Sequence, residues 1–116
     1  MKFVLSPEIK EYKEKGLPIL ALESTIIAHG MPYPENYAFA KNAEKTCRQN
    51  NVAPATIAIL NGKIHVGLTK KDLKKVCESK NILKTSKREI PVFTSKNLSG
   101  ATTVSATAWI AYKCGI

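Results

Sequence analysis

Apolar runs alternate with amphipathic segments along the chain. Residues 18–22 and 55–60 are nearly continuous apolar runs, which is the pattern of strands buried on both faces of a parallel sheet. Between them, Phe39, Ala43 and Cys47 recur at helical spacing, so we expect an amphipathic helix there. Buried strands that alternate with helices predict an α/β layered fold, an α/β/α sandwich around a mixed, mostly parallel sheet.

Capping and turn signals divide the rest of the chain. Ser6 and Pro7 have the order expected at a helix start, with a capping hydroxyl before a proline. Asn61 and Gly62 stand between two apolar runs and indicate a hairpin turn. The other expected elements are a helix over 6–16, a loop over 29–34, strands over 63–66 and 90–94, and helices over 69–79 and 100–113.

The last residues bear on the extent of the domain. Gly115 stands where a left-handed helix cap is usual, and a strand is the element that follows such a helix in an α/β fold. We therefore expect a sheet that is incomplete at its C-terminal end, with residues 1–116 as the N-terminal part of a single domain. With 44% hydrophobic residues, the chain has the composition of a folded core and not of a disordered segment.

The net charge of +9 is concentrated in one stretch of the sequence. Between Lys63 and Arg88 there are nine basic residues, and Asp72 and Glu78 are the only acids. Such a stretch attracts nucleic acid, an acidic surface or a small phosphorylated substrate, or it is a solvated helix face. It contains no aromatic residue on which bases would stack, so nucleic acid is not an expected partner.

The cysteines and the N-terminus bear on the compartment. Cys47, Cys77 and Cys114 lie too far apart for a C-x-x-C pair, so we expect buried thiols in a reducing compartment. No apolar run has the length of a secretory signal or a membrane span. These features predict a cytoplasmic protein with no membrane partner, although they do not distinguish the cytoplasm from the interior of an organelle.

Glu23 is the first candidate for chemistry because it directly follows the first buried apolar run. Ligands of open α/β sheets bind beyond the carboxyl ends of the strands, where a carboxyl group can act as a general acid. The alternative is a structural acid that the hydroxyls of Ser24 and Thr25 satisfy. His29 and His65 also have two interpretations, either a base or ligand, or a hydrogen-bonded structural histidine.

Two further features suit a phosphate. Residues 100–103, Gly-Ala-Thr-Thr, stand at an expected helix start, where small residues leave backbone N–H groups open to an anion. Lys84 lies between a basic helix and an expected strand, where it either binds phosphate or is simply exposed. The P-loop pattern is absent, and spacing alone does not decide between these interpretations.

Four strings of residues carry a resemblance to a known family. They are residues 21–27 (ALESTII), 29–34 (HGMPYP), 52–59 (VAPATIAI) and 100–104 (GATTV). In this order and spacing they resemble the pseudouridine-5'-phosphate glycosidase family, also called the indigoidine synthase A family, over nearly the whole chain. The resemblance implies a glycosidase, classed as a hydrolase or lyase, of pseudouridine catabolism. Its reaction is the reversible cleavage of the C–C glycosidic bond of pseudouridine 5'-phosphate to uracil and ribose 5-phosphate.

The resemblance also implies roles for three residues. Glu23 matches the family's proton donor, Lys84 a substrate-binding lysine, and Val104 a position whose main chain contacts the substrate. The family uses a divalent metal, usually Mn²⁺, and a lysine that forms a Schiff base with the sugar. The metal-binding aspartate and that lysine belong to motifs beyond residue 116, so we assign no metal ligand and no nucleophile in this chain. The family assembles as homotrimers.

The working hypothesis is the N-terminal part of such a glycosidase. Because the nucleophile and the metal ligand belong to other motifs, we expect the 116 residues alone to be inactive toward pseudouridine 5'-phosphate. Two alternatives remain open. One is a basic nucleic-acid-binding module on residues 63–88, and the other is a noncatalytic interaction piece.

Overall fold

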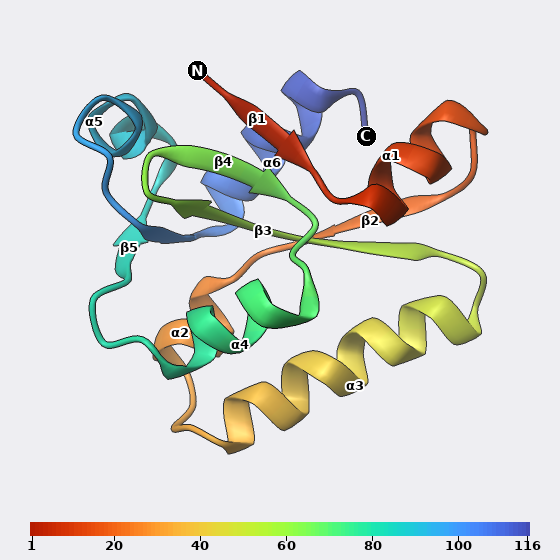
Figure 1. The fold of residues 1–116 in the computed structure, drawn as a ribbon, viewed down its shortest axis with the longest axis horizontal. Coiled ribbons are helices and arrows are strands. Elements are labelled where there is room, and N and C mark those ends of the chain that lie inside the picture. The colour runs from red at the N-terminus through yellow and green to blue at the C-terminus, as the bar shows by residue number, and fades with distance from the viewer.

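Strand β3 (Ala53–Leu60) organises the sheet, and all eight of its residues are buried. The computed structural model describes residues 1–116, and Figure 1 shows β3 crossing the middle of the molecule. The other strands are β1 (Phe3–Leu5), β2 (Ile19–Leu22), β4 (Lys63–Val66), β5 (Leu83–Thr85) and β6 (Gly100–Thr102). They form a six-stranded sheet in the order β1-β4-β3-β6-β5, with β2 pairing separately with β3.

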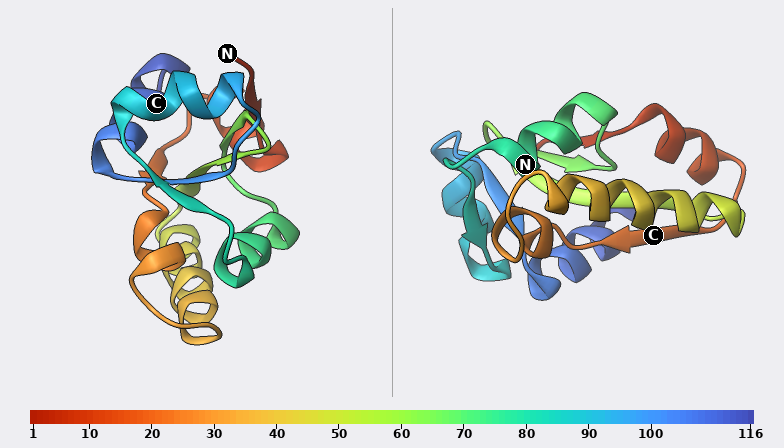
Figure 2. Two further views of the ribbon diagram at one scale, coloured as in Figure 1. Left: turned by 90° about the vertical axis from the view of Figure 1, so that its left-hand side faces the viewer. Right: turned by 90° about the horizontal axis from the view of Figure 1, so that it is seen from below.

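The helices lie in two layers, one on each face of the sheet (Figure 2). They are α1 (Pro7–Glu14), α2 (Thr25–His29), α3 (Glu35–Gln49), α4 (Lys70–Glu78), the 3-10 turn η1 (Lys87–Glu89), α5 (Ile90–Ser95) and α6 (Val104–Cys114). Alternate residues of β3 face opposite layers. Ile57 and Ile59 pack with α1, α5 and α6, whereas Ala58 and Leu60 pack with α2, α3 and α4.

The predicted fold class is confirmed. Three strand pairings are parallel (β1–β4, β2–β3 and β5–β6), and two are antiparallel (β3–β4 and β3–β6). The sheet is therefore mixed and mostly parallel, between helices, as the alternating pattern indicated. None of the helices combines the length and the apolar character needed to cross a membrane.

The predicted strand over 90–94 is wrong, because these residues form helix α5. The cause is a helix start that the apolar, β-branched sequence conceals. Ser86 and Glu89 form a capping box, in which the Ser86 N–H donates to the Glu89 carboxylate at 2.8 Å. Pro91 then stands in the first turn, where a proline fits a helix. The strand in this region is β5, which comes earlier and includes Lys84.

The predicted helix start at residue 100 is four residues too early. Residues 100–102 form β6, which pairs antiparallel with β3 through Ile59 and Gly100 and through Ala58 and Ala101. Helix α6 begins only at Val104, after the N-cap Thr103. Packing explains why residue 100 is a glycine, since a Cβ at this position would lie 2.8 Å from the Phe93 ring.

The two strands β2 and β6 occupy the same edge of β3. β2 pairs in parallel with the first half of β3, from Ile19–Ala53 to Leu22–Thr56, whereas β6 pairs antiparallel with its second half. The two strands therefore run toward each other, and their carboxyl ends meet opposite Ile57. This meeting point positions the site described below.

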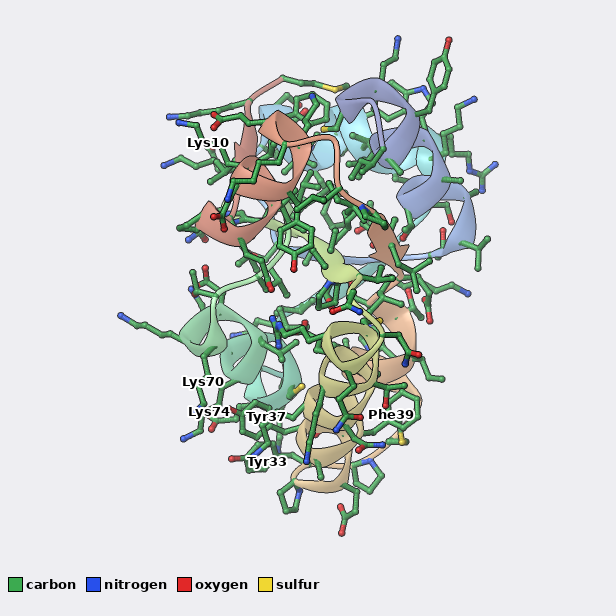
Figure 3. The ribbon with its side chains drawn as sticks, turned by 90° about the vertical axis from the view of Figure 1, so that its right-hand side faces the viewer. Lys10, Tyr33, Tyr37, Phe39, Lys70 and Lys74 are labelled. Carbon is green, nitrogen blue, oxygen red and sulfur yellow. The ribbon has the colours of Figure 1, made fainter.

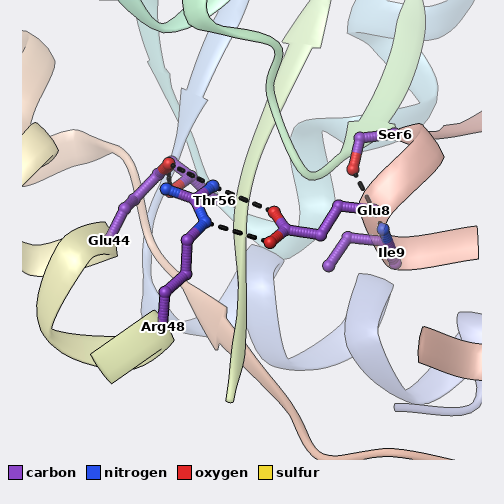
Figure 4. Close-up of polar contacts among 6 residues, drawn as sticks. All are labelled: Ser6, Glu8, Ile9, Glu44, Arg48 and Thr56. Carbon is purple, nitrogen blue, oxygen red and sulfur yellow. Dashed lines mark hydrogen bonds and ion pairs between the residues drawn. The ribbon is translucent and has the colours of Figure 1, made fainter. Parts of the chain in front are cut away.

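A buried acid joins α3 to β3 and, through an arginine, to α1. The Glu44 carboxylate accepts hydrogen bonds from the Thr56 hydroxyl at 2.7 Å and from Arg48 at 3.2 Å. Arg48 also donates two bonds to Glu8, at 3.0 and 2.9 Å (Figure 4). Burial raises the pKa of Glu44 despite the opposing effect of its bonds to Thr56 and Arg48.

The raised pKa of Glu44 predicts a specific dependence of stability on pH. The contribution of this group is fully present below the pKa of the unfolded chain and is lost as pH rises through the higher pKa of the folded state. Relative to Glu44→Gln, the wild type should lose free energy of unfolding as the pH is raised from about 4 to about 7. Urea denaturation of both proteins across this range measures the difference, and a relative gain by the wild type would contradict the prediction.

Candidate functional site

Four buried oxygen atoms are hydrogen-bonded to one another where β2 and β6 meet. They belong to Ser24, Ile57, Thr102 and Thr107, and we call these four residues the hydroxyl junction. The Ser24 and Thr102 hydroxyls both donate to the Ile57 carbonyl, at 2.6 and 2.7 Å. The Ser24 hydroxyl in turn accepts from the Thr102 N–H at 2.8 Å, and the Thr107 hydroxyl donates to that of Thr102 at 2.8 Å. The ends of the two strands are therefore fixed relative to each other without a continuous ladder.

Glu23 lies directly beside the junction and is half-buried. Its carboxylate accepts from the Thr25 N–H at 3.1 Å and from the Ile26 N–H at 3.2 Å. Glu23 thereby caps α2. The side chain of the N-cap residue normally has this role, but here the N-cap residue is Ser24, whose hydroxyl is engaged in the junction. The partners of the acid are thus backbone amides, and not the hydroxyls that the sequence suggested.

The Glu23 carboxylate is reachable from outside. It lines a pocket of about 200 Å³ with mostly apolar walls, which include Leu22, Ile26 and Phe39. An acid at a helix N-terminus that also faces a pocket is both held in place and open to a ligand.

Lys84 lies in β5, in register with Ala101 of β6. The Ala101 carbonyl accepts from the Thr25 hydroxyl at 3.3 Å, so Lys84 is on the strand next to the one that contacts the start of α2. Its side chain is exposed and forms no salt bridge. The ammonium is therefore free to pair with an anion.

Val104 is the first residue of α6, and its side chain points into solvent. The preceding residue, Thr103, donates its N–H to the Thr85 carbonyl of β5 at 3.0 Å. Its hydroxyl accepts from the Ala106 N–H and so caps the helix. The N–H groups of Val104 and Ser105 have no acceptor within the helix, because no helical carbonyl lies four positions before them. The end of β6 thus presents backbone donors and the positive end of a helix dipole, next to β5.

The two histidines do not join this arrangement. His29 is exposed in the last turn of α2. His65 lies on β4, on the far side of β3 from β6, and its Nδ1 is 4.0 Å from an Asp72 carboxylate oxygen. Burial lowers the pKa of His65 despite the nearby carboxylate. Neither histidine side chain forms a hydrogen bond, so the structure supports neither of the two interpretations of them.

The cysteines and acids provide neither a nucleophile nor a metal cluster. Cys77 and Cys114 are buried and free, and burial raises the pKa of Cys77 to about 11, which keeps its thiol protonated. Cys47 is also free but only half-buried, so the expectation of a buried thiol is wrong for this residue. No three His, Cys, Asp or Glu side chains come together in a group that would hold a metal ion. These residues therefore do not fit a divalent-metal site.

The basic stretch divides between two surfaces. The lysines of α4 point away from the molecule, as Figure 3 shows for Lys70 and Lys74, and Lys74 pairs with Glu78 at 3.6 Å. Lys87 and Arg88 belong to the opposite layer and line a hollow together with Trp109. The α4 part of the stretch has the form of a solvated helix face.

The fold and these three strand ends define a class of protein. It is an α/β scaffold in which the carboxyl ends of β2, β5 and β6 lie side by side, and a carboxylate and an open helix N-terminus follow two of these ends. The chain belongs to the family described as indigoidine synthase A like protein, whose family model matches residues 8–116.

Curated relatives give this family an enzymatic activity. The chain is 50% identical to a pseudouridine-5'-phosphate glycosidase of Alkaliphilus metalliredigens over 111 residues, which are 96% of the chain and 36% of the relative. It is likewise 50% identical to that of Petrotoga mobilis over 112 residues, or 97% of the chain and 37% of the relative. The chain therefore spans slightly more than a third of the length of the curated relatives that it matches.

Two crystal structures share the fold. An indigoidine synthase A-like protein from Thermotoga maritima superposes with a TM-score of 0.87 at 30% identity. The prealnumycin C-glycosynthase, in complex with ribulose 5-phosphate, superposes with a TM-score of 0.87 at 34% identity. Each alignment covers 100% of this chain and 37% of the matched one.

The hydroxyl junction predicts a measurable stability effect. Ser24→Ala should lower the free energy of unfolding by about 1–3 kcal/mol, because the buried Thr102 N–H loses its acceptor and the Ile57 carbonyl loses a donor. Ser95→Ala is the control, since that serine is exposed and bonds only within its own helix. Equal urea midpoints for the two variants would show that the junction does not stabilise the fold.

Proposed function

We propose that these residues supply the acid and the sugar-phosphate side of a pseudouridine-5'-phosphate glycosidase site. The whole reaction is the reversible cleavage of the C–C glycosidic bond to give uracil and ribose 5-phosphate. The observation that supports the proposal is the convergence of the carboxyl ends of β2, β5 and β6, the strands that precede or contain Glu23, Lys84 and Val104. The names of the curated relatives and the ribulose 5-phosphate complex of a similar fold support it.

Glu23 is the proton donor in this proposal. The N–H groups of Thr25 and Ile26 donate to its carboxylate and fix the position of the oxygen atoms that would carry the proton. The adjacent pocket gives the ligand access to them.

Lys84 and the start of α6 hold the phosphate in this proposal. Lys84 provides an unpaired positive charge, and the N–H groups of Val104 and Ser105 provide donors at the positive end of a helix. The two elements are linked, since Thr103 donates its N–H to Thr85, the residue after Lys84.

The remaining catalytic groups come from outside these residues in this proposal. The resemblance implies a Schiff-base lysine and a divalent ion, Mn²⁺ in most members, but the described residues form no cluster that would hold a metal. We therefore derive no step through a metal ion. The homotrimeric assembly and the cytoplasmic location of the enzyme are part of the same proposal and rest on the resemblance.

The first test is whether the chain binds sugar phosphate without reacting. The purified 116-residue protein should bind ribose 5-phosphate in calorimetry but release no uracil from pseudouridine 5'-phosphate. Lys84→Met should weaken the binding at least about tenfold, since it removes a charge-assisted contact. Lys96→Met, at the end of α5, is the control and should bind as the wild type does. Uracil release by the wild-type chain, or equal binding by Lys84→Met, would contradict the proposal.

The second test concerns Glu23. The chain is fused at Ile116 to the segment that follows the matched region in the Petrotoga mobilis glycosidase, and uracil release is measured. Glu23→Gln should lower the rate by a factor of about 10²–10⁴, because Gln keeps an acceptor for the α2 amides but cannot donate the proton. Glu35→Gln, an exposed acid at the start of α3, should leave the rate unchanged. A fully active Glu23→Gln fusion would exclude the assigned role.

A further inference from the structure

An open hollow of about 570 Å³ lies between η1, α5 and α6. Its walls include Lys87 and Arg88 of η1, and Ser105 and Trp109 of α6. The volume is within the range of pockets that hold small ligands. No acidic side chain lines the hollow, so its two charged side chains are both positive.

These two cations have no partner within the chain. Neither Lys87 nor Arg88 takes part in a salt bridge, and neither side chain donates a hydrogen bond. The neighbouring acid, Glu89, is engaged with the backbone, because its carboxylate accepts from the Ser86 N–H at 2.8 Å. An unpaired guanidinium and an unpaired ammonium in one hollow suit a dianion such as a phosphate monoester.

Hydrogen bonds fix the backbone that carries these side chains. The Lys87 N–H donates to the Ser105 hydroxyl at 3.2 Å, which ties η1 to the first turn of α6. The capping box of Ser86 and Glu89 fixes the turn itself. The walls of the hollow are therefore in place before a ligand arrives, which lowers the entropic cost of binding.

Trp109 adds an aromatic wall to the hollow. It is the only tryptophan of the chain and is half-buried on α6. The Lys113 ammonium lies 5.5 Å from the centre of its ring, which adds positive charge beside the indole. Aromatic side chains stack on nucleobases, and nearby cations pair with the phosphate of the same molecule. The hollow therefore combines the two kinds of contact that a nucleotide needs.

The hollow is separate from the region of Glu23 and Lys84. Lys84 is in register with Ala101, so both side chains lie on one face of the sheet, and Ala101 packs with α2, α3 and α4. The hollow belongs to the opposite layer, and Figures 1 and 2 show α5 and α4 on opposite sides of the sheet. A ligand in the hollow thus does not take the place of one that Lys84 binds.

We propose that this hollow binds a nucleoside monophosphate, with the phosphate on Lys87 and Arg88 and the base against Trp109. It is a second ligand site, and the inference does not depend on the proposed reaction. It rests on the two unpaired cations, the aromatic wall and the absence of an acid in one hollow of ligand size.

The fluorescence of Trp109 tests the proposal, because the chain has no other tryptophan. Titration of the 116-residue protein with uridine 5'-monophosphate should quench this fluorescence and saturate at one site, since a stacked base contacts the indole. Uridine lacks the phosphate, and ribose 5-phosphate lacks the base. Each should therefore require a concentration at least about tenfold higher for the same occupancy of the hollow.

Variants locate the bound nucleotide. Arg88→Met should weaken its binding at least about tenfold, and Lys87→Met replaces this variant if it does not fold. Lys96→Met, at the end of α5 and outside the hollow, should bind as the wild type does. Lys84→Met should also leave this binding unchanged, which separates the hollow from the site of the proposed function.

Four results would overturn the proposal. They are no quenching by uridine 5'-monophosphate, equal binding of uridine, binding that survives both Arg88→Met and Lys87→Met, and binding that is lost in Lys84→Met. The last result would place the nucleotide on the opposite face of the sheet, so it would contradict the second site without contradicting the proposed function.

Discussion

The structure depends on the hydrogen bonds that Ser24 and Thr102 make to the Ile57 carbonyl. β2 and β6 reach the same edge of β3 from opposite directions, so no regular ladder joins them where they meet. Without the two hydroxyls, a carbonyl in the middle of a fully buried strand would have no partner there. These side-chain bonds, together with one backbone bond from the Ser24 N–H to the Thr102 carbonyl at 3.1 Å, hold both strand ends in place.

The same constraint creates the site. Because the Ser24 hydroxyl is used in the junction, the start of α2 is capped by Glu23, which fixes that carboxylate at the strand end. Because Thr102 is anchored, α6 begins next to β5, where Thr103 donates its N–H to the Thr85 carbonyl. The carboxyl ends of β2 and β6 thus bring an acid and an open helix start close to each other.

Local patterns in the sequence predicted much of the fold, and long-range contacts account for the rest. The buried strands and capped helices follow from apolar runs and from signals such as Thr69. β6 could not be predicted in this way, because Gly100–Thr102 become a strand only by pairing with a strand some forty positions earlier. The roles of Glu23, Lys84 and Val104 came from the family resemblance, and the structure shows only that their strand ends converge. The hydroxyl junction was missed; its one local signal was the Ser-Thr and Thr-Thr pairs that follow β2 and end β6.

We propose that three separate strand ends form one anion-binding site. Titration of the ¹⁵N-labelled chain with ribose 5-phosphate, followed by backbone amide shifts, tests this claim most directly. The amides of Thr25, Ser86 and Val104 should shift together and fit one dissociation constant, since each follows a different converging strand. Shifts confined to the α4 lysines at 70–75, or different dissociation constants at the three positions, would contradict it.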